Sequence, residues 1–240
     1  MNVMPKILTV GEIDFPISDV DLPGYGTGIR LPNHVRTMFE KGAHVVRIRS
    51  LTTARKIPDR GGRTGGTRSL LIHKDHLATS KEGQEKPARF IMLSKSTEGE
   101  RRSSTVFMLA YAAKKVLAIE EEYFNDGRRR RSAARERAYD ERFRITEEQY
   151  HRCFSGDYEQ IVAEVVAQGY TDELAVRLGI LGYLMRGTHA DKLMEQSLER
   201  IRGLYLELRV ETGDIVIIDN EAGFHGRRGI NDPLQRNFCT

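Results

Sequence analysis

Four consecutive β-branched residues, Ile215 to Ile218, constrain the fold of this 240-residue chain more than any other stretch. A Gly-Asp turn at 213–214 precedes them, and the polar pair 219–220 follows them. A short β-branched run between turn residues is typical of a buried strand. His225 is therefore predicted to lie just beyond a core strand.

The last part of the chain also carries an arginine at a set interval from this histidine. A Gly- and Arg-rich loop over 226–229 and a turn at 231–233 lead into a last predicted strand over 235–239. That strand contains Arg236, eleven residues after His225. A histidine and an arginine on adjacent strands can share one pocket.

A metal site would need further ligands, because one imidazole does not hold a metal ion. In the extended segment upstream, side chains alternate between faces, so His73 and Asp75 point the same way and Lys74 points the opposite way. With His225 they form a 2-His-1-carboxylate set, which occupies one face of an octahedral Fe(II) and leaves the other face for substrate, dioxygen or water. Arg236 then fits the role of a bidentate partner for a co-substrate carboxylate.

The spacing of His73 and Asp75 indicates a metal site only in combination with His225 and Arg236. Taken alone, a histidine two residues from an acid is common and usually marks an exposed or hydrogen-bonded pair. His76 competes as a ligand, but its odd offset from His73 puts it on the other face of an unbroken strand, which favours a supporting role. The remaining histidines are interpreted as surface residues: His34, His44, His151 and His189.

These motifs together resemble those of the Fe(II)/2-oxoglutarate dioxygenases, most of all the taurine dioxygenase and clavaminate synthase group. The shared features are the His-x-Asp pair, a helix-rich insertion, the 213–220 strand, the distal histidine and the arginine eleven residues after it. The resemblance implies a fold that is mainly β with α. Its core would be a double-stranded β-helix, or jelly roll, with a helical insertion at about 120–186 in a single domain spanning 1–240.

The resemblance also implies roles for individual residues. Iron would bind His73, Asp75 and His225, 2-oxoglutarate would bind Arg236 and Thr105, and a substrate carboxylate would bind Arg227. Thr105 is equally compatible with an ordinary strand threonine, and Ser103 and Ser104 are neighbouring alternatives. Arg227 can also pair with Asp219 or another local acid, and Arg228 is interpreted as solvated.

The activity that the resemblance implies is the hydroxylation of an unactivated C–H bond with Fe(II), 2-oxoglutarate and O₂, giving succinate and CO₂ as co-products. The expected substrate is a small polar molecule that carries a carboxylate, such as an amino acid or a natural-product intermediate. The same oxidising chemistry can also desaturate, cyclise or epimerise a substrate. Asp75 argues against halogenation, because the resemblance implies that halogenases of this kind lack the carboxylate ligand, so that chloride can bind the metal.

Two features depart from the group, and two other functions remain open. Ile218 stands where the taurine dioxygenases favour an aromatic residue, and the chain is short for the group. A non-redox metal enzyme or cupin-like isomerase would not need Arg236. A nucleic-acid-binding module would use the basic run from Arg128 to Arg142, but aromatic residues are sparse there, which favours a solvated surface loop.

Composition limits the expected partners, disulfide bonds and cellular location of the chain. Lys and Arg number 38 against 34 Asp and Glu, so the net charge of +4 arises from mixed signs, and nucleic acid is not an expected partner. The two cysteines, Cys153 and Cys239, are too few for a disulfide framework and are predicted to be free thiols. No apolar run has the length of a membrane span or a signal peptide, so a cytoplasmic protein is expected. A homo-oligomer is compatible with the sequence.

Local patterns predict the remaining elements. Strands are expected over 6–10, 43–48, 88–94, 105–109 and 204–210, and helices over 32–41, 110–124, 161–169, 174–185 and 190–201. The 204–210 strand is expected to pair with 215–218 through the turn at 211–214. Residues 125–127 are expected to end the 110–124 helix. The loop 49–68 and the helical block are candidates for a lid over the site, and a plain connection explains the loop equally well.

Overall fold

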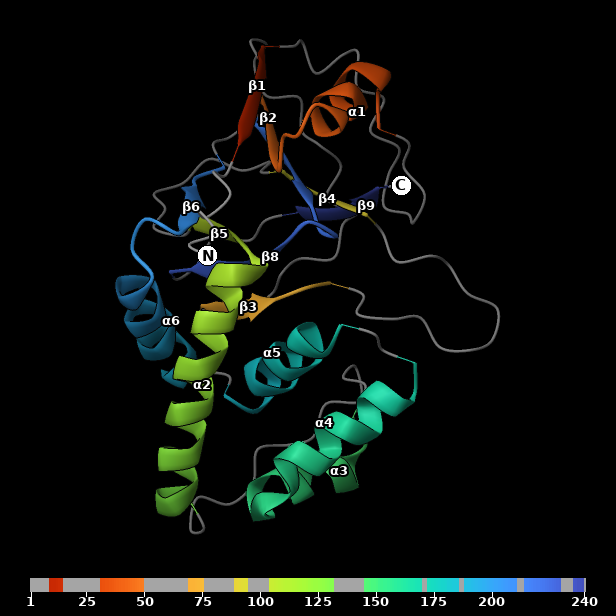
Figure 1. Cartoon of the computed structure of the whole chain (residues 1–240). Helices are drawn as coiled ribbons and strands as arrows, with labels where there is room; N and C mark the ends of the chain where they lie inside the picture. Colours follow the sequence, from red (N-terminus) through yellow and green to blue (C-terminus); the bar gives the residue numbers. More distant parts are fainter. Residues whose placement is uncertain are drawn as a thin grey trace, which may run out of the picture.

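A computed structural model describes residues 9–14, 31–49, 69–75, 89–94, 104–131, 145–169, 172–185, 188–210, 214–229 and 235–239. Its strands form two β-sheets, and most of its helices gather beside one of them (Figure 1). The helix predicted at 110–124 and the extended segment predicted around His73 both contribute to this arrangement.

The first sheet has five strands. Their order is β1 (Val10–Asp14), β2 (Val45–Arg49), β7 (Ile215–Asp219), β4 (Phe90–Ser94) and β9 (Gln235–Cys239). β1 runs parallel to β2, and the other neighbouring pairs are antiparallel. The β-branched run 215–218 is thus a central strand that is buried along its whole length, as predicted.

The second sheet has four strands, and all of its pairs are antiparallel. Their order is β3 (Leu70–His73), β8 (Gly223–Arg228), β5 (Ser104–Leu109) and β6 (Tyr205–Leu208). The pairing of β3 with β8 is irregular, because its register shifts between Leu70 and His73. This sheet carries both histidines of the predicted metal site.

One helix precedes β2, and the others lie between β5 and β6 in the sequence. They are α1 (Asn33–Glu40), α2 (Ala110–Arg131), α3 (Glu147–Arg152), a π-helical turn η2 (Cys153–Asp157), α4 (Tyr158–Ala167), α5 (Glu173–Leu184) and α6 (Thr188–Arg200). None of these helices combines the length and the apolar composition that crossing a lipid bilayer requires.

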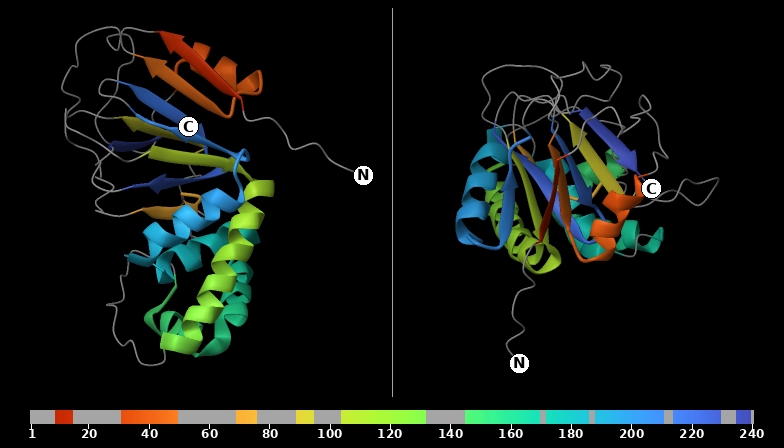
Figure 2. Two further views of the ribbon diagram at one scale, coloured as in Figure 1. Left: turned by 90° about the vertical axis from the view of Figure 1, so that its left-hand side faces the viewer. Right: turned by 90° about the horizontal axis from the view of Figure 1, so that it is seen from above.

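Three apolar clusters hold the elements together as layers. α1 packs Val35 and Phe39 against the outer face of the five-stranded sheet. The cluster between the sheets includes Val216 of β7 and Phe107 of β5. A third, larger cluster joins the other face of the four-stranded sheet to α2 and α4–α6. Figure 2 shows the result, with α1 at one end of the stack and the helices of the third cluster at the other.

The strand registers place the metal-site positions on the face that looks toward the five-stranded sheet. Directly opposed residues of neighbouring strands share a face. His225 is opposed by His73 on one side and by Phe107 on the other. Because Phe107 packs between the two sheets, the His73 and His225 positions face the interior of the sandwich.

The structure corrects two predictions about the C-terminal segment. Residues 226–229 do not form a loop after His225, because β8 continues from Gly223 to Arg228 and His225 lies inside it. Every β8 residue is opposed by a β5 residue, so pairing with a neighbouring strand outweighs the local preference of glycine for turns. His225 and Arg236 are also not on adjacent strands, since β8 and β9 belong to different sheets.

The predicted pairing of 204–210 with 215–218 is also wrong. β6 pairs with β5, whereas β7 pairs with β2 and β4. A short connection between two strands is typical of a hairpin, but here it crosses from one sheet to the other. The two strands then contribute to opposite walls of the sandwich.

The helices follow the sequence signals except at the end of α2. Thr146 and Gln149 form a capping box at the start of α3, and the Asp172 carboxylate accepts a hydrogen bond from the Ala175 amide at the start of α5. The turn residues 125–127 do not end α2, which continues to Arg131. A glycine costs only about 1 kcal/mol inside a helix, which the flanking helix-forming residues offset. Most of the basic run lies outside the described residues.

Candidate metal centre

His73, Asp75 and His225 converge at one end of the four-stranded sheet. Nε2 of His73 lies 3.4 Å from Oδ1 of Asp75, and Nε2 of His225 lies 3.3 Å from Oδ2 of the same carboxylate. The two imidazole rings are tilted against each other with their centroids 4.5 Å apart. One ligand atom from each of the three residues lies within 4.8 Å of the others, so one ion can bind all three.

The His73 imidazole is held in the tautomer that a metal ligand needs. Its Nδ1 lies 2.8 Å from the carbonyl oxygen of Leu71. A carbonyl only accepts hydrogen bonds, so Nδ1 carries the proton and Nε2 keeps its lone pair in the neutral ring. Metal-binding histidines commonly donate their other N–H to such a carbonyl. The Leu71 contact therefore orients Nε2 of His73 toward the carboxylate.

His225 is more deeply buried than His73, with 2% of its surface exposed. The next residue, Gly226, allows the close approach of β3 to β8. A Cβ atom at Gly226 would lie 2.7 Å from the Leu70 carbonyl oxygen and 2.8 Å from Cδ1 of Ile72. This position needs glycine for lack of space, and the tight packing of the two strands brings His73 and His225 together.

Asp75 lies beyond the end of β3, where side-chain contacts hold its backbone. The Asp75 amide donates to Oδ1 of Asn220 at 3.2 Å, and Nδ2 of Asn220 donates to the Asp75 carbonyl at 2.9 Å. Lys74 points away from the ligands, as predicted, and its ammonium group donates to Asp172 and to the Glu221 carbonyl.

The donor set fits a hard or borderline divalent ion of octahedral preference. Two imidazoles and one carboxylate are the protein ligands of non-haem Fe(II) sites, and three ligands leave positions open. Adjacent ligand atoms around an octahedral ion with bonds of about 2.1 Å lie roughly 3 Å apart. Nε2 of each imidazole lies close to that distance from one oxygen of Asp75, at 3.4 Å for His73 and 3.3 Å for His225.

Arg227 and Thr105 oppose each other on neighbouring strands of the same sheet. Both are buried, with 7% and 2% of their surfaces exposed. Arg227 is two residues from His225 and lies on the same face of β8. Asp219, the acid suggested as an alternative partner for Arg227, instead binds Arg89 and the amides of Glu221 and Ala222.

The third arginine of this segment, Arg228, is engaged elsewhere. Its guanidinium group donates to the carboxylates of Glu195 and Glu207. Hydrogen bonding to Glu195 is the main cause that raises the pKa of Arg228. Ser104, an alternative to Thr105, donates its hydroxyl to Glu207 and so belongs to the same network. Neither residue faces the metal site in this arrangement.

Arg236 lies on the five-stranded sheet, across the sandwich from His225. It is opposed by Leu93 of β4, and Leu93 is opposed by Val216 of β7. Leu93 and Val216 both pack in the cluster between the sheets, so the Arg236 position is on the inward face. His76, Ser103 and residues 50–68 lie outside the described part of the chain.

Asn220 is a residue of this site that the sequence did not identify. The sequence pattern indicates only a strand end at 219–220, and 145 positions separate Asn220 from Asp75. The only local signal is an asparagine immediately after a buried strand, a position where its amide can bind backbone groups. Its partner could be found only from the structure.

No protein-family model matches this sequence, and neither does any curated protein. Solved structures of related shape include AAD-2 in complex with Mn(II) and N-oxalylglycine (13% identity, 96% of this chain and 93% of that chain, TM-score 0.41). Another is the non-heme iron oxygenase OrfP in complex with Fe (14% identity, 88% of this chain and 80% of that chain, TM-score 0.39). A third is PvcB from Pseudomonas aeruginosa (15% identity, 89% of this chain and 82% of that chain, TM-score 0.37).

Proposed function

We propose that this chain is an Fe(II)- and 2-oxoglutarate-dependent oxygenase that hydroxylates a C–H bond of a small polar substrate. The observation that carries the proposal is the convergence of two imidazoles and one carboxylate on a point inside the sandwich. A 2-His-1-carboxylate set with open positions is the ligand set of non-haem Fe(II) oxygenases.

The order of the strands supports a double-stranded β-helix. From β2 to β5 the chain alternates between the two sheets, and from β6 to β9 it alternates again. The long helical segment stands between these two halves. Two such windings of antiparallel strands form a jelly roll, whose interior can hold a ligand between the sheets.

Iron bound to His73, Asp75 and His225 would supply the oxidising chemistry, with 2-oxoglutarate and O₂ as co-substrates and succinate and CO₂ as co-products. The protein residues then bind and orient the reactants. Both imidazoles offer Nε2, and the Leu71 carbonyl keeps the proton of His73 on Nδ1. The low exposure of His225 limits the access of water to that side of the site.

Arg236 and Thr105 are the proposed anchors of 2-oxoglutarate. A guanidinium group offers two parallel N–H donors to a carboxylate, and a threonine hydroxyl can add a third. The two positions belong to opposite walls of the sandwich, and the registers of β9 and β5 put both on inward faces. A ligand between the sheets can therefore reach both residues.

Arg227 is the proposed partner of a substrate carboxylate, because its position is two residues from a metal ligand and on the same face. A free amino acid, or a natural-product intermediate derived from one, carries such a group. The same residues are compatible with desaturation, cyclisation or epimerisation, since the outcome depends on how the substrate is held.

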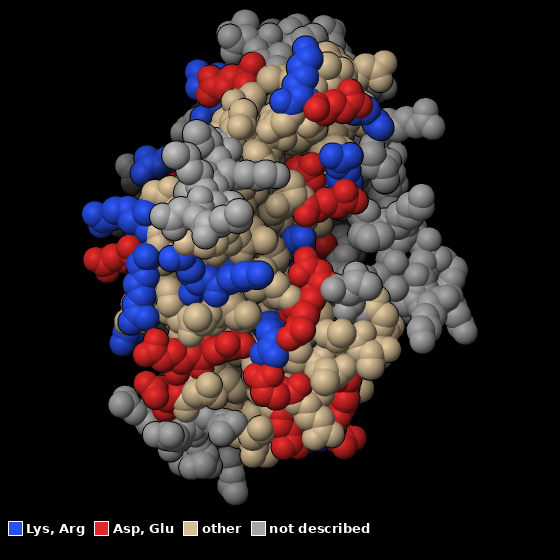
Figure 3. Space-filling view, viewed as in Figure 1, with Lys and Arg blue, Asp and Glu red and all other residues tan. Residues whose placement is uncertain are grey.

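Nucleic-acid binding has less support. Among the residues coloured in Figure 3, positive and negative side chains are interspersed, and acidic side chains predominate over basic ones in the lower part of the face. Binding to a phosphate backbone relies on clustered positive charge. A non-redox metal enzyme that uses the same three ligands is the alternative that needs a direct test.

The test is oxygen-dependent turnover of 2-oxoglutarate. Purified protein loaded with Fe(II) should form succinate from 2-oxoglutarate in air, and a screen of amino acids and related metabolites should contain compounds that accelerate succinate formation. A chain that binds Fe(II) but forms no succinate with any compound would be a non-redox metal protein, which would overturn the proposal.

A further inference from the structure

The side chain of Asn220 makes the backbone hydrogen bonds with Asp75 that a paired strand would otherwise make. A residue past the end of a strand loses its ladder partner, and its part-buried amide and carbonyl need other hydrogen bonds. The side chain of Asn220 binds both groups, through Oδ1 at 3.2 Å and Nδ2 at 2.9 Å. An amide plane that binds the N–H and the C=O of one residue fixes both the position and the orientation of its backbone.

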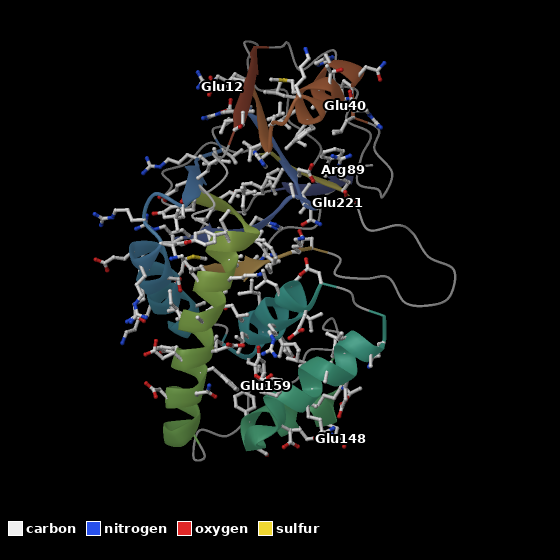
Figure 4. The ribbon with its side chains drawn as sticks, in the orientation of Figure 1. Glu12, Glu40, Arg89, Glu148, Glu159 and Glu221 are labelled. Carbon is white, nitrogen blue, oxygen red and sulfur yellow. The ribbon has the colours of Figure 1, made fainter. Side chains whose placement is uncertain are left out.

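Asn220 is itself held firmly by backbone contacts. It is 5% exposed, and its amide donates to the Arg89 carbonyl at 2.7 Å, next to the start of β4. The turn that follows is closed by Asp219, whose Oδ1 accepts hydrogen bonds from the amides of Glu221 and Ala222. The side chains of Arg89 and Glu221 approach within 3.7 Å at this turn (Figure 4). The side chain that binds Asp75 thus belongs to a hydrogen-bonded connection between the sheets.

Lys74 supports the same segment from its opposite side. Its ammonium group lies 3.0 Å from Oδ2 of Asp172 and 3.1 Å from the Glu221 carbonyl, and it also stands over the ring of Phe224. Lys74 and Asn220 therefore tie the backbone on either side of the 74–75 peptide bond to the connection between β7 and β8. His225 belongs to β8, so this connection leads directly to another ligand.

We infer that Asn220 is a positioning residue for the metal ion, which it serves by fixing the backbone from which the Asp75 carboxylate projects. The inference rests on the proposed function, because it requires that Asp75 bind a metal. Hydrogen-bond partners that orient metal ligands typically change metal affinity by about 10- to 100-fold when they are removed. Without Asn220, the Asp75 segment gains freedom that metal binding must then remove.

The experiment measures Co(II) binding by titration, with the d–d absorption of the bound ion as a report on its coordination. Asn220→Ala removes both hydrogen bonds, and Gln149→Ala is the matched control. Gln149 is also a buried amide, 8% exposed, and it binds Thr146 and Glu164 in the helical block. Far-UV circular dichroism and metal-free melting identify a temperature at which each variant is folded.

Asn220→Ala should weaken Co(II) binding about 10- to 100-fold and change the d–d spectrum, while Gln149→Ala changes neither. Asn220→Asp provides a second variant of the same size, which keeps an acceptor for the Asp75 amide but loses the donor to its carbonyl. It should also bind Co(II) more weakly, although its added negative charge attracts cations. Wild-type affinity and spectrum in either folded variant would overturn the role of Asn220, whereas a wild-type protein without Co(II) affinity would overturn the proposed function instead.

Discussion

The two oxygens of the Asp75 carboxylate face different imidazoles, with Oδ1 3.4 Å from Nε2 of His73 and Oδ2 3.3 Å from Nε2 of His225. Asp75 therefore stands at the centre of the ligand set. Although Asp75 lies beyond the end of β3, its carboxylate stands between His73 of β3 and His225 of the neighbouring strand β8.

Metal binding should depend on each member of this set. His225→Ala and Asp75→Ala should each abolish succinate formation and leave the fold intact, because two remaining protein ligands hold Fe(II) too weakly. Circular dichroism and metal content would be measured along with succinate. His151→Ala is the control, since His151 is an exposed residue of α3 that pairs with Glu147. Full activity in the Asp75 or His225 variant would contradict the metal-ligand assignment.

Arg236→Ala should weaken the binding of 2-oxoglutarate far more than that of iron. Removing one partner of a buried charged pair costs about 2–5 kcal/mol, which corresponds to a roughly 30- to 5000-fold increase in the Michaelis constant for 2-oxoglutarate. Arg228→Ala is the control, because Glu195 and Glu207 already engage that guanidinium group. If the Michaelis constant stays unchanged in Arg236→Ala, Arg227 becomes the candidate anchor.

Arg227→Gln should raise the Michaelis constant of the substrate and leave the substrate-independent decarboxylation of 2-oxoglutarate nearly intact. The reason is the position of Arg227 on the face of β8 that carries His225, opposite Thr105. Both rates would be measured in one preparation. Parallel loss of the two activities would mean that Arg227 supports the binding of iron or 2-oxoglutarate. Its position directly opposite Thr105, a proposed anchor of 2-oxoglutarate, would explain that role.

The sequence predicted those parts of the site that depend on local pattern. Alternation along one strand was enough to place His73 and Asp75 together and Lys74 apart from them, and the β-branched run identified β7. The partner strands could not be predicted, because pairing depends on contacts between segments far apart in the chain. The local pattern therefore indicates the wrong neighbour for the 204–210 strand and gives no link between Asn220 and Asp75. It also predicts that His225 lies beyond a strand, because the glycines around it favour turns locally, whereas β5 and β3 extend the ladder through them.

Gly226→Ala should disturb the site through packing alone. A methyl group at this position would lie too close to a backbone carbonyl of β3, so the two strands that carry His73 and His225 must separate. We expect a lower melting temperature and weaker metal binding. Gly182→Ala is the matched control: its Cβ meets only Leu71, at an ordinary 3.7 Å, and α5 should gain about 0.5–1 kcal/mol from alanine. Equal effects of the two substitutions would contradict the packing argument.

Glu120→Gln should change how the free energy of unfolding depends on pH. Glu120 belongs to the buried stripe of α2, together with Val116 and Phe124, and neither of its carboxylate oxygens has a hydrogen-bond partner among the described residues. Burial, and secondarily the charge of Glu121, raises the pKa of Glu120 well above its usual value of 4.5. The folded protein therefore keeps the proton at pH values where the unfolded chain has lost it.

Between the unfolded and folded pKa of Glu120, the folded state binds more protons, so the contribution of this group to stability falls as the pH rises. The decline is on the order of 1 kcal/mol for each pH unit in that window. Glutamine does not titrate, so the stability of Glu120→Gln relative to the wild type should increase as the pH rises above the usual glutamate pKa of 4.5 in urea unfolding experiments. Glu122→Gln, an exposed position on the same helix that pairs with Arg200, should show no such trend. A pH-independent difference between Glu120→Gln and the wild type would mean that Glu120 is not held in its neutral form by the fold.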